Sequence, residues 1–138
     1  MERSRPAFTD MVISNGAEET TAAITLEWRG RIWHGEARGP GDRDHRQRLV
    51  GEAALDAVHR LFEPHITLDL SGVAATDLGG MTMAVAQVEL HPSGDRFAGS
   101  ALVREGSVEE ATVRAVLDAM NRSIELAGPA QEPNPTGI

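Results

Sequence analysis

Apolar residues recur at two different spacings along this chain, and the changes between them predict where strands give way to helices. Apolar and polar residues alternate through residues 24–28 and 65–71, as they do in half-buried strands. Apolar residues recur every three to four positions through residues 44–62 and 107–126, as they do on the buried face of a helix. The chain is therefore predicted to combine both kinds of element.

Turn signals predict the remaining strands. Gly30, which stands between two arginines, and the polar segment 91–95 each predict a tight turn. Residues 32–37, 81–90 and 96–104 are the predicted strands on either side of these turns. Each turn is therefore predicted to close an antiparallel hairpin.

Both predicted helices begin at capping signals. A short carboxylate, on Asp42 or Asp44, can accept hydrogen bonds from the free N–H groups of the first helix. Ser107 and Glu110 have the spacing of a capping box at the start of the second helix. Pro64 is predicted to end the first helix.

The resulting order is ββαβββα, which predicts an α+β fold: a mostly antiparallel sheet of five strands with two helices on one face. Residues 21–126 form this single domain. Residues 1–20 lack periodicity and predict a flexible N-terminal arm, although residues 11–13 can dock on a partner or pair at a sheet edge. Small residues at 72–80 predict a loop, and proline and glycine at 127–138 predict a disordered tail.

Composition excludes several classes of function. The formal net charge of −8 opposes binding to nucleic acid and to anionic lipid. The chain has no cysteine, so disulfides, thiol catalysis and cysteine zinc sites are excluded. There is no apolar run long enough to span a membrane and no signal peptide, so the expected location is the cytoplasm.

No catalytic or metal-binding pattern stands out. The five histidines show no ligand spacing and are expected to lie at or near the surface. They are His34, His45, His59, His65 and His91. Ser100 lies in a predicted strand rather than in a nucleophile elbow. We therefore expect no enzyme activity, no cofactor and no bound metal.

Two segments are candidate ligand sites, each with a plainer alternative. The arginines at 38–48 lie before and at the start of a predicted helix. They can hold a carboxylate or phosphate there, or they can simply pair with neighbouring carboxylates. Glycines at 74–80 let a backbone pass close to a ligand or a second subunit, or they form a flexible connection. Asp77 in this segment is the one carboxylate that no cap explains.

Residues 22–124 resemble the C-terminal regulatory domain of 2-isopropylmalate synthases, which senses leucine and forms dimers. The matching pieces are Gly39-Pro40 before the first helix, Gly79-Gly80 before the long strand, Gly99, and residues 115–122 in the last helix. Met81 and Thr82 differ from the acidic residue and alanine usual in that family. Because the catalytic barrel of that family is absent, the resemblance implies a free-standing sensor or dimerisation module.

The hypothesis that follows is a regulatory, small-molecule-binding homodimer whose ligand is an amino acid or another anion. Its predicted ligand-binding residues are Gly39, Pro40, Arg43, Asp77, Gly79 and Gly80. A second copy is expected to cover an apolar sheet face that the helices leave open. The residues predicted for that face are Trp33, Ala84, Ala86 and Val88.

Three alternatives remain open. The first is an interaction or scaffold protein without a ligand, which recruits a partner through residues 11–13 or the tails. The second is an enzyme with an unfamiliar site built from His34, His45 or Asp77. The third is binding to double-stranded RNA, which the net charge of −8 opposes.

Overall fold

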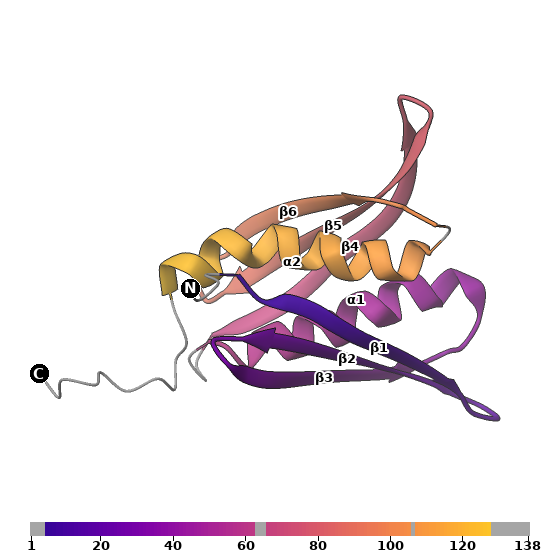
Figure 1. The fold of residues 1–138 in the computed structure, drawn as a ribbon, viewed down its shortest axis with the longest axis horizontal. Coiled ribbons are helices and arrows are strands. Elements are labelled where there is room, and N and C mark those ends of the chain that lie inside the picture. The colour runs from indigo at the N-terminus through magenta and orange to yellow at the C-terminus, as the bar shows by residue number, and fades with distance from the viewer. Residues whose placement is uncertain (1–4, 63–65, 106, 128–138) are drawn as a thin grey trace, which may run out of the picture.

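The computed structural model describes residues 5–62, 66–105 and 107–127, which form six strands and two helices in the order βββαβββα (Figure 1). The elements are β1 (Ala7–Asn15), β2 (Thr20–Trp28), β3 (Arg31–Gly39), α1 (Arg43–His59), β4 (Thr67–Leu78), β5 (Met81–His91), β6 (Asp95–Leu102) and α2 (Val108–Ala127). All strand pairs are antiparallel. The predicted α+β class is therefore confirmed.

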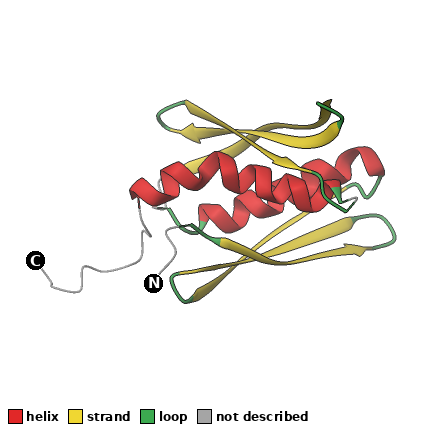
Figure 2. Ribbon diagram, turned by 45° about the horizontal axis from the view of Figure 1, so that its top comes forward, coloured by secondary structure: helices red, strands yellow, loops and turns green. Residues whose placement is uncertain are grey.

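The strands form two three-stranded sheets rather than one sheet of five strands. Their orders are β1-β2-β3 and β4-β5-β6, and the two helices lie between them (Figure 2). Helix α1 packs mainly on β3 and β2, helix α2 packs mainly on β6 and β5, and the helices also contact each other. Each sheet thus has one face against the helices and one outer face.

Two strands extend into segments that the sequence predicted as irregular. Residues 7–15, within the predicted flexible arm, form β1, which pairs with β2 at the sheet edge. Residues 72–78, within the predicted loop, continue β4 to Leu78 because each pairs with β5. In both places pairing with a neighbouring strand outweighs weak local propensity. Beyond Ala127, the predicted disordered tail lies outside the described residues.

The chain folds as two equivalent βββα units, which we call the first half (7–59) and the second half (67–127). Both first strands carry a register shift at the same place, after Phe8 and after Leu70. The helices share a sequence: residues 53–58 read Ala-Ala-Leu-Asp-Ala-Val and residues 115–120 read Ala-Val-Leu-Asp-Ala-Met. The sequence analysis did not identify this internal repeat.

A glycine in each half sets how closely helix and sheet approach. A Cβ placed on Gly35 would lie 2.2 Å from the carbonyl oxygen of Ala53, and one on Gly99 would lie 2.2 Å from that of Ala115. Since real Cβ atoms do not approach backbone oxygens so closely, any larger residue would push the helix away. Small helix residues and strand glycines therefore define the centre of the core in both halves.

Candidate functional site

Three of the predicted ligand-binding residues lie where β3 leads into α1. Gly39 ends β3 opposite Thr20, and Pro40 follows it. Arg43 is the first residue of α1, and its side chain lies outside the described part of the structure. Asp42 is the N-cap, with Oδ1 accepting a hydrogen bond from the His45 backbone N–H at 2.9 Å. The chain's own carboxylate thus occupies the helix start that was predicted to hold an anion.

The other three lie on the β4–β5 hairpin. Gly79 and Gly80 form its turn, with φ of +61° and +83°, a conformation that glycine adopts without strain. Asp77 is on β4 rather than in a loop, and its Oδ1 accepts a hydrogen bond from Thr82 Oγ1 at 2.7 Å. This bond ties the two strands together just before the turn.

The same tie occurs in the first half of the molecule. Thr20 Oγ1 donates to Asn15 Oδ1 at 3.1 Å, at the equivalent place on the β1–β2 hairpin. Because both halves contain this contact, it gives Asp77 a structural role that the sequence analysis did not find. The signal was the matching position of Asn15 and Asp77 in the internal repeat.

The two groups of predicted residues belong to different sheets. Figure 1 shows the tip of the β4–β5 hairpin projecting away from the start of α1. Gly39 and Pro40 therefore do not share a hairpin, a sheet or a helix end with Gly79 and Gly80. Any ligand that contacts both groups must bridge the two halves.

The histidines are dispersed over separate elements. His34 on β3 contacts Thr25 Oγ1 at 3.2 Å, and His91 at the end of β5 lies 2.9 Å from Asp69 Oδ2. His45 lies at the start of α1, His59 lies at its end, and His65 lies outside the described residues. Among the described residues, no group of three or more His, Asp or Glu could hold a metal ion.

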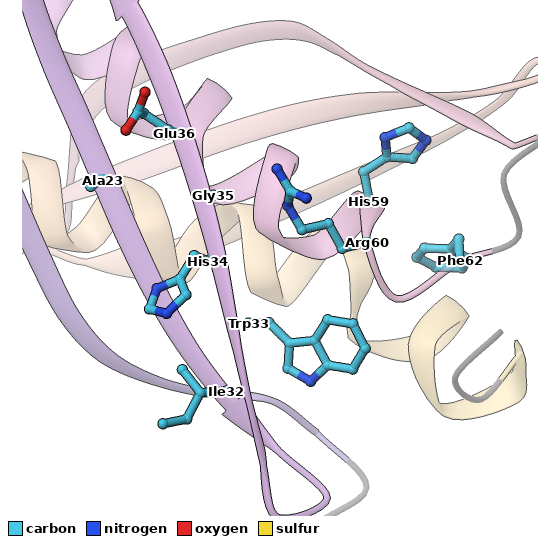
Figure 3. Close-up of a pocket in the computed structure, with 9 residues that line it drawn as sticks. All are labelled: Ala23, Ile32, Trp33, His34, Gly35, Glu36, His59, Arg60 and Phe62. Carbon is cyan, nitrogen blue, oxygen red and sulfur yellow. The ribbon is translucent and has the colours of Figure 1, made fainter. Parts of the chain in front are cut away.

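The apolar residues predicted to face a partner lie instead on the inner side of the sheets. Ala84 and Val88 are fully buried, Ala86 is almost so, and all three belong to the face of β5 that packs on α2. Trp33 also faces inward, beside the end of α1 (Figure 3). The prediction of this face was wrong because alternation shows which residues share a side but not which side the helices cover.

A different apolar surface lies on the outer face of the second sheet. Residues that alternate with Ala84 and Ala86 on β5 point away from α2, and the strand register adds their neighbours on β4 and β6. We call this surface the apolar patch: Ala74, Thr76, Leu78, Met81, Met83, Val85, Ser100 and Leu102. Leu78 is 68% exposed, Met81 46% and Leu102 38%. The patch contains no charged residue.

The outer face of the first sheet has charges at the matching places. Arg38, Glu36 and His34 on β3 correspond to Leu102, Ser100 and Ala98 on β6, by their registers with β2 and β5. Arg38 Nε lies 3.3 Å from Glu36 Oε1, so this surface carries its own exposed ion pair. Only the second half therefore presents an uncharged outer face around its hairpin.

A hollow of about 930 Å³ runs along the free edge of β3, where α1 ends (Figure 3). We call it the edge groove. Residues 32–36 form one wall, with Ala23 behind them, and His59, Arg60 and Phe62 form the other. Of the predicted ligand-binding residues, the five whose side chains or backbone the structure describes in full do not line it: Gly39, Pro40, Asp77, Gly79 and Gly80.

Comparison with known proteins adds no assignment. No family model matches the chain, and no curated protein matches it. Within the described residues, no helix has both the length and the hydropathy that crossing a membrane requires. The resemblance to the regulatory domain of 2-isopropylmalate synthases stays a prediction.

Proposed function

We propose that this protein is a non-catalytic regulatory module of the cytoplasm that acts as a homodimer and binds a small molecule. The observation that carries the proposal is the apolar patch, which exposes Leu78, Met81 and Leu102 on one surface. Apolar surfaces of this kind mark interaction sites, because water solvates them poorly.

A second copy of the same chain is the best match for the patch. Each copy carries a formal charge of −8, so two copies repel each other over most of their surfaces. The patch lacks charge, and a two-fold axis can place it against itself without an unpaired ion. The patch lies on the face of the second sheet that points away from α2, so the helices of the two copies would lie on the far sides of the paired sheets.

The proposed ligand is an amino acid or another small anion. The proposed contacts come from the turn glycines Gly79 and Gly80, from Asp77, and from the start of α1 at Gly39, Pro40 and Arg43. The turn glycines adjoin Leu78 and Met81 in the patch, so a ligand at the turn would also touch the dimer interface. Binding and pairing would then be linked.

Sedimentation equilibrium at micromolar concentration tests the homodimer. The expected result is a mass of two chains, and a single-chain mass at all concentrations contradicts the proposal. Thermal shift against a library of amino acids and small anions tests ligand binding. A rise of a few degrees for one compound supports it, because a ligand stabilises only the state that binds it.

A homodimeric scaffold without a ligand is the second candidate. The tie between Asp77 and Thr82 favours it, since the equivalent Asn15–Thr20 tie in the first half gives this contact a structural role. A two-chain mass together with no thermal shift from any compound in the library supports the scaffold over the sensor.

A further inference from the structure

The edge groove combines a free strand edge with side chains on both sides of it. Strand β3 is at the edge of its sheet, and the Glu36 backbone N–H points outward, where it donates to Asp56 Oδ2 at 2.9 Å. Backbone groups of alternate residues in an antiparallel strand point the same way. The N–H and C=O groups of Ile32 and His34 therefore also point to the open side of β3, away from β2.

Apolar side chains lie on either side of this edge. Trp33 and Phe62 form the inner side, and Ile32, which is 63% exposed, lies on the outer side (Figure 3). Trp33 Nε1 is buried and has no hydrogen-bond partner among the described residues. The groove thus offers an apolar surface beside the outward-pointing backbone groups.

Among the described residues that line the groove or contact its lining groups, three are arginines and two are carboxylates: Arg31, Arg38 and Arg60 against Glu36 and Asp56. The Arg31 guanidinium lies over the Trp33 ring, 5.2 Å from its centroid, and within the described residues it makes no ion pair. Arg60 lines the groove itself, with Nη2 3.4 Å from Asp56 Oδ2. Among the described residues that line the groove, the one carboxylate is on Glu36, and Arg38 pairs with it. The Arg31 guanidinium therefore offers an incoming acidic group a positive charge that no carboxylate among the described residues offsets.

We propose that the edge groove binds an extended acidic peptide, which adds to the first sheet as a fourth strand beside β3. Backbone groups of the peptide pair with those of Ile32 and His34, as in other cases of strand addition. Alternate peptide side chains then point to opposite faces. An apolar one packs on Trp33 and Phe62, and acidic ones lie near Arg31 and Arg60.

The equivalent edge in the second half provides an internal control. Strand β6 is also an edge strand, and its Ser100 N–H donates to Asp118 Oδ2 at 3.0 Å, as Glu36 does to Asp56. By register, Asp95 stands where β3 has Arg31. Arg96 stands where β3 has Ile32 and lies 3.7 Å from Glu89, so Asp95 and Arg96 give this part of β6 no net positive charge. An acidic peptide is therefore expected to prefer the edge of β3 to the edge of β6.

Fluorescence polarisation with two synthetic peptides of about nine residues tests the proposal. One alternates glutamate with valine and phenylalanine, and the other has lysine in place of every glutamate. Saturable binding of the acidic peptide, at least about tenfold tighter than that of the lysine peptide, is expected. Equal binding of both peptides, or binding of neither, overturns the proposal.

Matched variants locate the site. His34→Pro removes an outward N–H that pairs with no strand, which edge positions tolerate, and Ala98→Pro does the same on β6. We expect at least about a tenfold loss of acidic-peptide binding for His34→Pro and none for Ala98→Pro. If His34→Pro does not fold, Arg31→Glu is expected to reverse the preference in favour of the lysine peptide.

Two outcomes would reject the assignment to this edge. One is acidic-peptide binding that survives both His34→Pro and Arg31→Glu in folded protein. The other is a change from a two-chain to a one-chain mass on His34→Pro, which would show that the edge pairs with a second copy instead. If a substitution in the apolar patch abolishes the dimer while acidic-peptide binding persists, the peptide proposal stands, because the patch lies on the other sheet.

Discussion

The first and second halves of the molecule have the same chain path but present different outer faces. Where β3 carries Glu36 and Arg38, the equivalent positions on β6 are Ser100 and Leu102. The inner faces, by contrast, share strand glycines and helix alanines. In each half a helix aspartate, Asp56 or Asp118, also accepts a hydrogen bond from the edge strand, and we call these two the edge-capping aspartates. The comparison indicates that packing on a helix restricts sequence in both halves, whereas the outer faces are free to acquire separate roles.

The repeat also separates structural contacts from candidate functional ones. The ties of Thr20 and Thr82 to Asn15 and Asp77 occur in both halves, and the fold alone accounts for them. The contact of Arg31 with Trp33 has no counterpart, because the second half has Asp95 at the position of Arg31. Contacts present in only one half are therefore the ones to test for function.

The largest expected effect is on the glycines that both halves share. Gly35→Ala and Gly99→Ala each put a Cβ against a helix carbonyl, and each is expected to destabilise the protein by about 3 kcal/mol or more. Chemical denaturation measures this, with Gly72→Ala as the control because its Cβ would meet nothing within 4 Å. A large loss of stability for one glycine variant and none for the other would show that the two halves do not pack equivalently.

The next effect concerns the outer faces. Leu102→Arg gives the second half the residue of the first half, and it is expected to weaken dimerisation at least about tenfold, because two arginines would meet in an apolar interface. Arg38→Leu is the matched control and is expected to leave the dimer unchanged. Sedimentation velocity measures both, and a dimer that survives Leu102→Arg would place the interface elsewhere.

The edge-capping aspartates give a smaller effect. Asp118→Ala leaves the Ser100 N–H to water and is expected to lower the free energy of unfolding by about 1 kcal/mol. Asp56→Ala is expected to cost slightly more, because Asp56 also pairs with Arg60. Thermal denaturation of the two variants provides the comparison. A markedly larger loss for Asp118→Ala would reverse the expected order.

The smallest effect is expected at the hairpin ties. Asp77→Asn copies the first half, where Asn15 accepts the same hydrogen bond, so stability should change by no more than about 0.5 kcal/mol. If Asp77 instead contacts a ligand, the thermal shift that this ligand causes falls in Asp77→Asn while the unliganded protein keeps its stability.

The sequence predicted the α+β class because periodicity reports local structure. It narrowed the first helix cap to Asp42 or Asp44 because capping is also local, and the structure has Asp42 as the cap. It gave pairing at a sheet edge only as an option for residues 11–13 and missed the length of β1, whose polar residues Thr9, Asp10 and Ser14 weaken the alternation around a register shift. It also could not divide the strands into two sheets, since spacing along the chain does not say which strands pair.

For the candidate site, too, the sequence predicted local features and missed those that depend on strand pairing. Gly79 and Gly80 form a turn at the end of the predicted loop 72–80, because glycine favours turns as a local property, and their contact with a ligand stays a prediction. The apolar patch was missed because it depends on strand register and on which face the helices cover. The edge groove was missed because it joins β3 to the end of α1, which are distant in sequence.

Spin-label distances between protomers test the account most directly, since the chain has no cysteine of its own to label. Gln87 and Thr25 occupy equivalent outer positions on β5 and β2. Labels on Gln87→Cys and Thr25→Cys should both show dipolar coupling in the dimer, with the shorter distance at position 87. A shorter distance at position 25, or no coupling at either position, would contradict pairing through the second half.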